Sequence, residues 1–314
     1  MTPAAAIGRT AVAQNGALEP LRRYPLLWFV LIAYAVSWAY TLPFLVLFPL
    51  PDFFWRTTPG ELGPAVAAVA MTAVVAGKPG LRRFFRRCVR WRVSVVWYLF
   101  TFVGVPAIYA LGILLVPGAA ASFTAPPRTF WLLYPVLFLA GMVLGGPLTE
   151  EPGWRGFALP RLEERWGPLA ASVVVGIIWA AWHAPQYLRP DWAAVNGGFT
   201  PGGVGVFALG LVIFSVIISW VYNHTRGSVL MAILLHASLN GSQALMSQLF
   251  PAAAGNEQGP LISFGLTALV VVVATRGRLG YVRPGQAAAP AGPTGRGSAP
   301  VVDEQPAALP GGGS

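Results

Sequence analysis

Residues 204–222 read VGVFALGLVIFSVIISWVY and include no charged side chain. An α-helix rises about 1.5 Å per residue, so a run of this length reaches across most of the roughly 30 Å of hydrocarbon in a bilayer. The run is therefore predicted to be a membrane-spanning helix.

Seven other stretches have the same apolar character. They cover residues 24–48, 60–76, 93–116, 129–148, 168–188, 229–249 and 260–275. Of the 314 residues, 55% are hydrophobic and 10% are charged, whereas soluble domains carry about 25% charged residues. A water-exposed surface needs more charge than this. The sequence therefore predicts an all-α polytopic membrane protein of about eight transmembrane helices, in contact with membrane lipid.

The formal net charge is +10, and the cations lie beside the apolar stretches. Residues 78–92, for example, read KPGLRRFFRRCVRWR. Because the cytoplasmic loops of membrane proteins are enriched in Lys and Arg, this segment and both termini are predicted to be cytoplasmic, in an integral protein of the plasma membrane. No basic stripe interleaves with a soluble fold, which argues against a nucleic-acid partner.

The chain is expected to have four parts. Residues 1–23 are an Ala-rich stretch predicted to be a disordered cytoplasmic leader, and residues 24–128 hold the first three membrane helices. Residues 129–283 hold the other five. Residues 284–314 are rich in Pro, Gly and Ala, and are predicted to be a disordered tail. Cys88 is the only cysteine, which excludes an intrachain disulfide and a Cys-rich zinc site.

Ionisable residues at membrane depth are costly, so those present are candidates for function. Glu150 and Glu151 directly follow an apolar stretch, and Arg155 is spaced i, i+4 from Glu151, so these two can pair on a helix. Glu-Glu alone is more often a pair of ordinary loop charges. The Gly145-Gly146-Pro147 run is a natural helix break, and we expect the chain beyond it to stay buried to about residue 162.

Two histidines lie within later apolar stretches. His183 is near the end of 168–188, and alone it is more often a satisfied structural group than a catalyst. His236 and Asn240 are spaced i, i+4 in 229–249 and project from one face of a helix. Interhelical hydrogen bonding is the simplest role for such a pair.

Taken together, these groups predict a hydrolytic site that the helices enclose within the membrane. A carboxylate with a histidine can hold and deprotonate water, and a histidine with an amide can donate hydrogen bonds to an oxyanion. The same groups are also possible zinc ligands, and a metal would be expected on Glu150, His183 and His236. Asn240 is a poor zinc ligand, so a metal-free site is slightly favoured.

At these residues the sequence resembles the CPBP family of intramembrane proteases, also called the CAAX protease and bacteriocin-processing or Abi family. The family pattern is Glu-Glu-x-x-x-Arg, then Phe-x-x-x-His, then His-x-x-x-Asn. Here Glu150-Glu151 with Arg155 match the first motif, Trp179 with His183 the second, and His236 with Asn240 the third. Trp179 departs from the usual Phe. The resemblance covers about residues 129–246 and marks 129–283 as the catalytic core.

The resemblance implies a peptide or membrane-protein substrate, and a CAAX-like C-terminal segment is one such substrate. Glu150 and His183 would activate water, His236 and Asn240 would form the oxyanion site, and Glu151 and Arg155 would orient the first pair. The substrate is expected to reach a cavity open to the cytoplasm. Two other hypotheses are a non-catalytic immunity or scaffold protein that retains the fold, and a proton-coupled transporter. The sequence does not indicate an oligomeric state.

Overall fold

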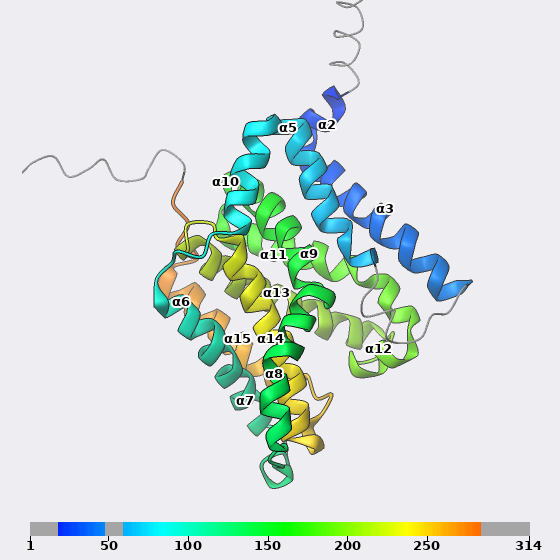
Figure 1. Ribbon diagram of the computed structural model, residues 1–314, viewed down its shortest axis with the longest axis vertical. Helices are drawn as coiled ribbons and strands as arrows, with labels where there is room; N and C mark the ends of the chain where they lie inside the picture. Colours follow the sequence, from blue (N-terminus) through cyan, green and yellow to red (C-terminus); the bar gives the residue numbers. More distant parts are fainter. Residues whose placement is uncertain (1–17, 48–58, 284–314) are drawn as a thin grey trace, which may run out of the picture. The chain divides into compact units, whose positions relative to one another are not determined.

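The computed structural model describes residues 18–47 and 59–283 (Figure 1). Within these residues all the regular structure is helical, which confirms the prediction of an all-α fold. The residues through Tyr281 belong to one compact unit, and the arrangement described below is that of this unit. Most of the predicted leader and all of the predicted tail lie outside the described residues. The last residues of the leader form a short helix.

The helices run in the following order: α2 (Glu19–Arg23), α3 (Pro25–Val46), η1 (Pro59–Leu62), α5 (Gly63–Cys88), α6 (Val95–Leu99), η2 (Phe100–Gly104), α7 (Val105–Leu114), η3 (Ala120–Ser122), α8 (Arg128–Leu144), α9 (Pro147–Gly153), η4 (Trp154–Ala158), α10 (Leu159–Trp166), α11 (Pro168–Trp182), η5 (Ala184–Leu188), α12 (Pro190–Val195), α13 (Pro201–His224), α14 (Val229–Leu249), η6 (Pro251–Ala253) and α15 (Gln258–Thr275). The turns η2 and η4 are π-helical, and the other η turns are 3₁₀.

Seven helical segments are long and apolar enough to cross a membrane, and a bent pair of helices makes an eighth. This confirms the predicted number of spans. The fifth and seventh predicted spans have the observed bounds, Pro168–Leu188 and Val229–Leu249. Large apolar side chains such as Leu132, Val270 and Val103 point outward, as contact with lipid requires.

The bent pair confirms the predicted break in the fourth span. Helix α8 ends at Leu144, and the chain turns by 43° before α9–α10 begins at Pro147. Gly146 lies at the turn with φ of 96°, in a region that favours glycine. The chain beyond the break stays buried as expected, since Phe157 and Leu162 are both in the core.

The second span differs from the prediction. We expected a helix over 60–76 followed by a loop, but the helical segment continues to Cys88. Gly77 has non-helical φ and ψ of 57° and −160°, so α5 consists of two helical parts that meet at a kink there, and the first part ends where the predicted span ends. The continuation is basic on its exposed side and buries Phe84. The continuation is therefore too polar to be recognised in the sequence as part of an apolar stretch.

Helix α14 is the central element of the bundle (Figure 1). It contacts α7, α8, α9 and α13, and 56% of its most apolar stretch is buried, against 22% for α3. Ser238 on α14 donates a hydrogen bond to the Thr101 carbonyl of η2 at 2.6 Å. The helix that carries His236 and Asn240 is therefore held on several sides.

Helices α11 and α13 pack closely because small residues line their contact. A Cβ atom at Gly176 would lie 2.6 Å from the Val212 Cα, so only glycine permits this approach. Ser215 of α13 donates a hydrogen bond to the Ser172 carbonyl of α11 at 2.8 Å. Such contacts fix α11, and with it the histidine at its end.

Candidate active site

The two adjacent glutamates lie on α9, directly after the break in the fourth span. Glu150 is 4% exposed and Glu151 is fully buried. A side chain at Gly146 would collide with the Glu150 carboxylate, so the glycine makes the turn possible and also leaves room for the acid. The π-helical turn η4 follows at once and carries Arg155. Such π-turns are frequent at functional sites.

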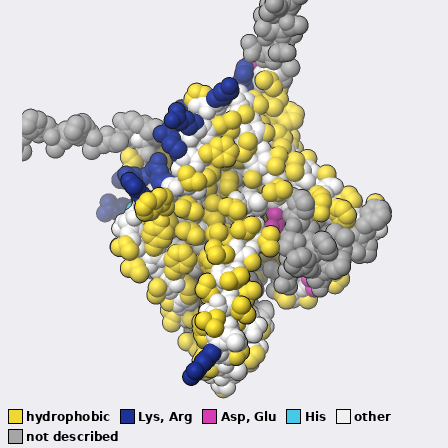
Figure 2. All heavy atoms as spheres, viewed as in Figure 1, with side chains coloured by type: hydrophobic (Ala, Val, Ile, Leu, Met, Phe, Trp, Pro, Cys, Tyr) yellow, Lys and Arg dark blue, Asp and Glu magenta, His cyan; other side chains and the backbone are white. Residues whose placement is uncertain are grey.

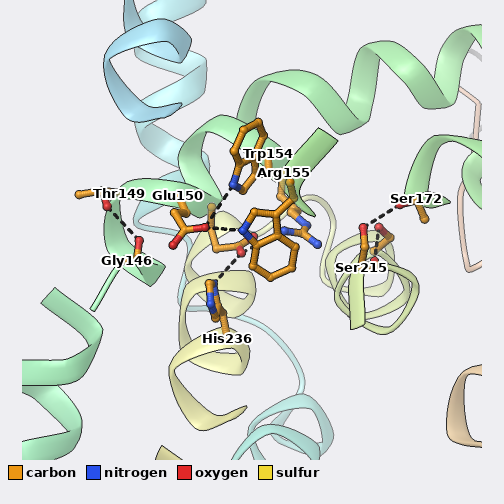
Figure 3. Close-up of polar contacts among 11 residues, drawn as sticks. Gly146, Thr149, Glu150, Trp154, Arg155, Ser172, Ser215 and His236 are labelled. Carbon is orange, nitrogen blue, oxygen red and sulfur yellow. Dashed lines mark hydrogen bonds and ion pairs between the residues drawn. The ribbon is translucent and has the colours of Figure 1, made fainter. Parts of the chain in front are cut away.

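Two tryptophans hold the Glu150 carboxylate (Figure 3). The indole N–H of Trp179 on α11 donates to Oε2 at 2.5 Å, and that of Trp154 donates to the same oxygen at 3.4 Å. Both indoles are essentially buried. The two donors occupy Oε2 and leave Oε1 for another group.

Glu151 points to different partners. Its Oε1 accepts a hydrogen bond from Arg155 Nη1 at 3.0 Å, which confirms the predicted i, i+4 pair. The same oxygen lies 2.9 Å from His236 Nδ1 of α14. A carboxylate oxygen only accepts, so Nδ1 carries the proton. The Arg155 guanidinium also lies over the Trp179 ring, 4.9 Å from its centroid. Glu151 thus contacts His236, and not the Glu150–His183 pair that we expected it to orient.

His183 ends α11 among aromatic rings. Its Nδ1 lies 2.9 Å from the Trp179 carbonyl oxygen, which can only accept a hydrogen bond, so the proton is on Nδ1. In the neutral imidazole Nε2 then keeps a lone pair. The ring packs against Trp182, Trp192 and Phe207. This tautomer makes Nε2 an acceptor for a water proton.

A cavity of about 860 Å³ brings the motifs together. Glu150, His183, His236 and Asn240 all line it, with Asn240 one turn beyond His236 on α14. Glu151 and Arg155 are not among the lining residues, and both side chains are fully buried. The six predicted residues therefore divide into four that reach the cavity and two that support them from behind.

Several charged cavity residues were absent from the sequence prediction. Glu61 of η1, Arg189 and Glu257 all line the cavity, and Glu257 accepts a hydrogen bond from Gln243 at 2.7 Å. Arg189 pairs with Asp191 at 2.5 Å. These residues lie at the ends of apolar stretches, where charges are ordinary. They also lie outside the three motifs, so no local pattern pointed to them. Trp179, in contrast, lies inside the second motif, and its indole N–H could have been identified as a donor from the sequence.

Glu150, His183 and His236 are the residues that would hold a metal ion. Among the residues that the structure describes, no three His, Cys, Asp or Glu side chains come together as a group that holds a metal ion. In the set named for zinc, Glu150 Oε2 accepts from two indoles and Nδ1 of His183 and of His236 each face an oxygen, so Glu150 Oε1 and the two Nε2 atoms are the atoms that could hold an ion. The mechanism proposed for this site uses no metal ion.

Comparison with known proteins finds one matching family and one curated relative. Residues 129–242 match a family described as type II CAAX prenyl endopeptidase Rce1-like. The chain is also 27% identical over 206 residues to CAAX prenyl protease 2 of Methanococcus maripaludis, which covers 60% of this chain and 71% of that protein. The matched family segment contains all six motif residues and α14 through Asn240. The chain, an integral membrane protein, is thus similar to CAAX proteases over the segment that carries the motifs.

Proposed function

We propose that this protein is an intramembrane endopeptidase, which hydrolyses peptide bonds of membrane-associated substrates, including CAAX-like C-terminal segments. The observation that carries the proposal is Glu150. It is a buried carboxylate with one oxygen fixed by two indoles, and it lies in a cavity with His183, His236 and Asn240. An acid placed this way in a membrane protein is costly to keep without a function.

Glu150 acts as the general base. Its Oε1 takes a proton from a water molecule in the cavity, while His183 Nε2 accepts a hydrogen bond from the second water proton and keeps the water in place. The water oxygen attacks the scissile carbonyl carbon. As the C–N bond breaks, Glu150 returns its proton to the leaving amine. Glu150 therefore ends the cycle as it began, as a carboxylate.

His236 and Asn240 stabilise the oxyanion that forms when water attacks. The Asn240 amide donates from its N–H₂ group. His236 donates from Nε2 when the ring is protonated, because Nδ1 already donates to Glu151 at 2.9 Å. Donors placed before the reaction begins are worth about 10²–10³-fold in rate.

Glu151 and Arg155 are positioning residues. Arg155 neutralises the charge of Glu151 in a fully buried pair and stacks over Trp179, the donor to Glu150. The pair therefore connects the two halves of the site. It sets the orientation of His236 directly, and it limits where the Trp179 ring can lie.

The test is single-turnover cleavage of a peptide library by the purified protein in detergent. Wild type and Glu164→Gln are expected to cleave the same peptides, because Glu164 is exposed on α10 and away from the cavity. Glu150→Gln is expected to bind those peptides and to leave them intact. Equal cleavage by wild type and Glu150→Gln contradicts the mechanism. A wild type that cleaves nothing across the library favours a scaffold instead.

A further inference from the structure

One end of the helix bundle gathers arginines, along the upper-left edge of Figure 2. We call it the basic end. The segment that follows the kink in α5 supplies many of its cations and exposes apolar side chains between them, since Phe85, Val89 and Trp91 are each more than half exposed. Such a segment at the end of a membrane helix is suited to the headgroup region of a bilayer, where anionic lipids attract Lys and Arg. Its cations are Lys78, Arg82, Arg83, Arg86, Arg87, Arg90 and Arg92.

Two arginines of the basic end meet at the π-helical turn η4. Arg87 Nη2 of α5 donates a hydrogen bond to the Gly156 carbonyl. Arg161 Nη1 of α10 donates to the next carbonyl, that of Phe157, at 2.8 Å. The two guanidinium groups are near enough for their positive charges to repel each other. The fold therefore holds two like charges, both half-buried, against one turn of the chain.

The turn after α13 brings a third arginine beside Arg87. Arg90 Nη1 donates a hydrogen bond to the Arg226 carbonyl in this turn, at 2.7 Å. The next residue of the turn is Gly227, where a Cβ atom would lie 3.7 Å from Arg87 Cδ and 3.2 Å from the Tyr222 hydroxyl. The turn therefore lies against the Arg87 side chain, and three arginines from separate parts of the fold come together here.

The acids of this region do not pair with these three arginines. Among the described residues, none of the three forms an ion pair with a carboxylate. The buried Glu163 of α10 accepts a hydrogen bond from Asn223 at 2.7 Å instead, and the exposed Glu164 attracts Arg161 without forming an ion pair with it. Arg87 Nε is buried and has no hydrogen-bond partner among the described residues. Excess positive charge beside an unpaired donor is suited to an anion with several oxygens, such as a phosphate.

We propose that Arg87, Arg90 and Arg161 bind the phosphate of an anionic phospholipid, and that this lipid stabilises the turn η4. Guanidinium groups bind phosphate oxygens through paired N–H donors, and basic pockets between membrane helices hold anionic headgroups. The ligand is a lipid and not a free anion, because the same segment of α5 exposes apolar side chains that contact acyl chains. The bound phosphate offsets the repulsion between the two arginines that donate to η4.

The turn η4 connects this lipid site to the catalytic motif. Its Arg155 forms the buried pair with Glu151. Phe84 of α5 packs against the same turn, since a Cβ atom at Gly156 would lie 2.8 Å from the Phe84 ring. A lipid that holds the arginine side chains on η4 therefore also limits the movement of Arg155. The lipid site itself does not depend on the proposed function, and only its effect on the cleavage rate does.

Thermal unfolding in lipid nanodiscs tests the site without any need for activity. The discs contain phosphatidylcholine, alone or with added phosphatidylglycerol. Phosphatidylglycerol should raise the wild-type Tm by about 3 °C, as expected of a ligand at roughly ten times its Kd. Arg87→Gln and Arg161→Gln should lose most of this rise. Lys78→Gln should keep it, because it removes the same charge from an exposed position about 13 Å along the helix from Arg87.

Three results would overturn the proposal. The first is a wild-type Tm that does not respond to phosphatidylglycerol. The second is an equal loss of the rise in Lys78→Gln, which would indicate a general effect of surface charge. The third is an equal rise when inorganic phosphate is added to discs of phosphatidylcholine alone, which would indicate that a free anion is the ligand. Should the two variants at η4 fail to fold, Arg90→Gln removes a charge from the site and leaves both hydrogen bonds to η4 in place.

Native mass spectrometry and cleavage give two further measurements. Wild type and Lys78→Gln released from the mixed discs should retain phosphatidylglycerol, and Arg87→Gln should retain less; equal retention by all three overturns the proposal. Phosphatidylglycerol should also raise the cleavage rate of wild type in the same discs. A rise in Tm with an unchanged cleavage rate contradicts the link through η4. A rise in Tm in a protein that cleaves no peptide supports the lipid site and counts against the proposed function alone.

Discussion

Glu150 and Glu151 are neighbours in the chain, yet their surroundings differ. Glu150 faces an open cavity and is held by two uncharged indole donors, whereas Glu151 is sealed behind it between an arginine and a histidine. A buried carboxylate with a full counter-charge holds its neighbours in place. One without a counter-charge, and with a free oxygen toward water, can accept a proton. We therefore propose a chemical role for Glu150 and a positioning role for Glu151.

Glu150→Gln is the largest test of this difference. It keeps the shape of the side chain and its contacts with the Trp179 and Trp154 indoles, but it removes the basic oxygen. We expect the single-turnover rate to fall by roughly 10²–10⁴-fold, the range for losing a general base. The melting temperature should change little, because Glu150 has no buried cation to leave unpaired. A rate within a few-fold of wild type would contradict the role of Glu150 as the base.

Glu151→Gln should lower the stability of the protein more than it lowers the cleavage rate, which is the opposite of what we expect for Glu150→Gln. It leaves the fully buried Arg155 without its ion-pair partner, and breaking a buried pair costs about 3–5 kcal/mol. Thermal unfolding and yield are expected to suffer first, and the cleavage rate of the surviving folded protein should fall less than in Glu150→Gln. An exposed control, Glu164→Gln, should match wild type in both. If Glu151→Gln were as stable as the control, the positioning role would be wrong.

Two further variants, His236→Ala and Asn240→Ala, test the oxyanion site on α14. Each should lower the chemical step by about 10²–10³-fold as a lost oxyanion donor. The peptide Kd should change little, since the oxyanion exists only in the transition state. Fluorescence-detected binding beside single-turnover cleavage separates the two quantities. A variant that loses binding and keeps its rate constant would contradict the oxyanion role.

The sequence identified much of this site, and the reasons for its limits are physical. Spacing of i, i+4 gave the Glu151–Arg155 pair and put Asn240 one turn beyond His236, because these are contacts within one helix. The Gly-Gly-Pro break also predicted that Glu150 lies inside the protein. The Glu151–His236 contact joins α9 to α14 across 85 positions in the chain, and no local pattern encodes it. The amphipathic part of α5 was missed because its charges masked its helical continuation.

Trp179→Phe tests the hold on Glu150 with the residue that is usual in the family pattern. The ring remains, but its N–H donor to Oε2 is lost. A hydrogen bond to a charged group contributes about 1.5–3 kcal/mol, and part of it should survive through Trp154 and water. We expect the rate to fall by about 10-fold, since about 1.4 kcal/mol corresponds to that factor. An unchanged rate would show that the indole packs against the acid without positioning it.

Glu257→Gln should have the smallest effect on the cleavage rate, and the direction in which it changes the pH dependence of stability is informative. Glu257 lines the same cavity as Glu150 but lies just before α15, where it accepts a hydrogen bond from Gln243 at 2.7 Å. Burial raises the pKa of its carboxyl above the usual range, and the Gln243 bond lowers it in part. A raised folded-state pKa stabilises the protein below the unfolded pKa, and that stabilisation is lost as pH rises through the folded value. Glutamine stays neutral, so Glu257→Gln should flatten the pH dependence of the melting temperature above about pH 4 and leave the cleavage rate within a few-fold of wild type. A loss of rate comparable to that of Glu150→Gln would mean that the catalytic carboxylate had been misassigned between the two acids of the cavity.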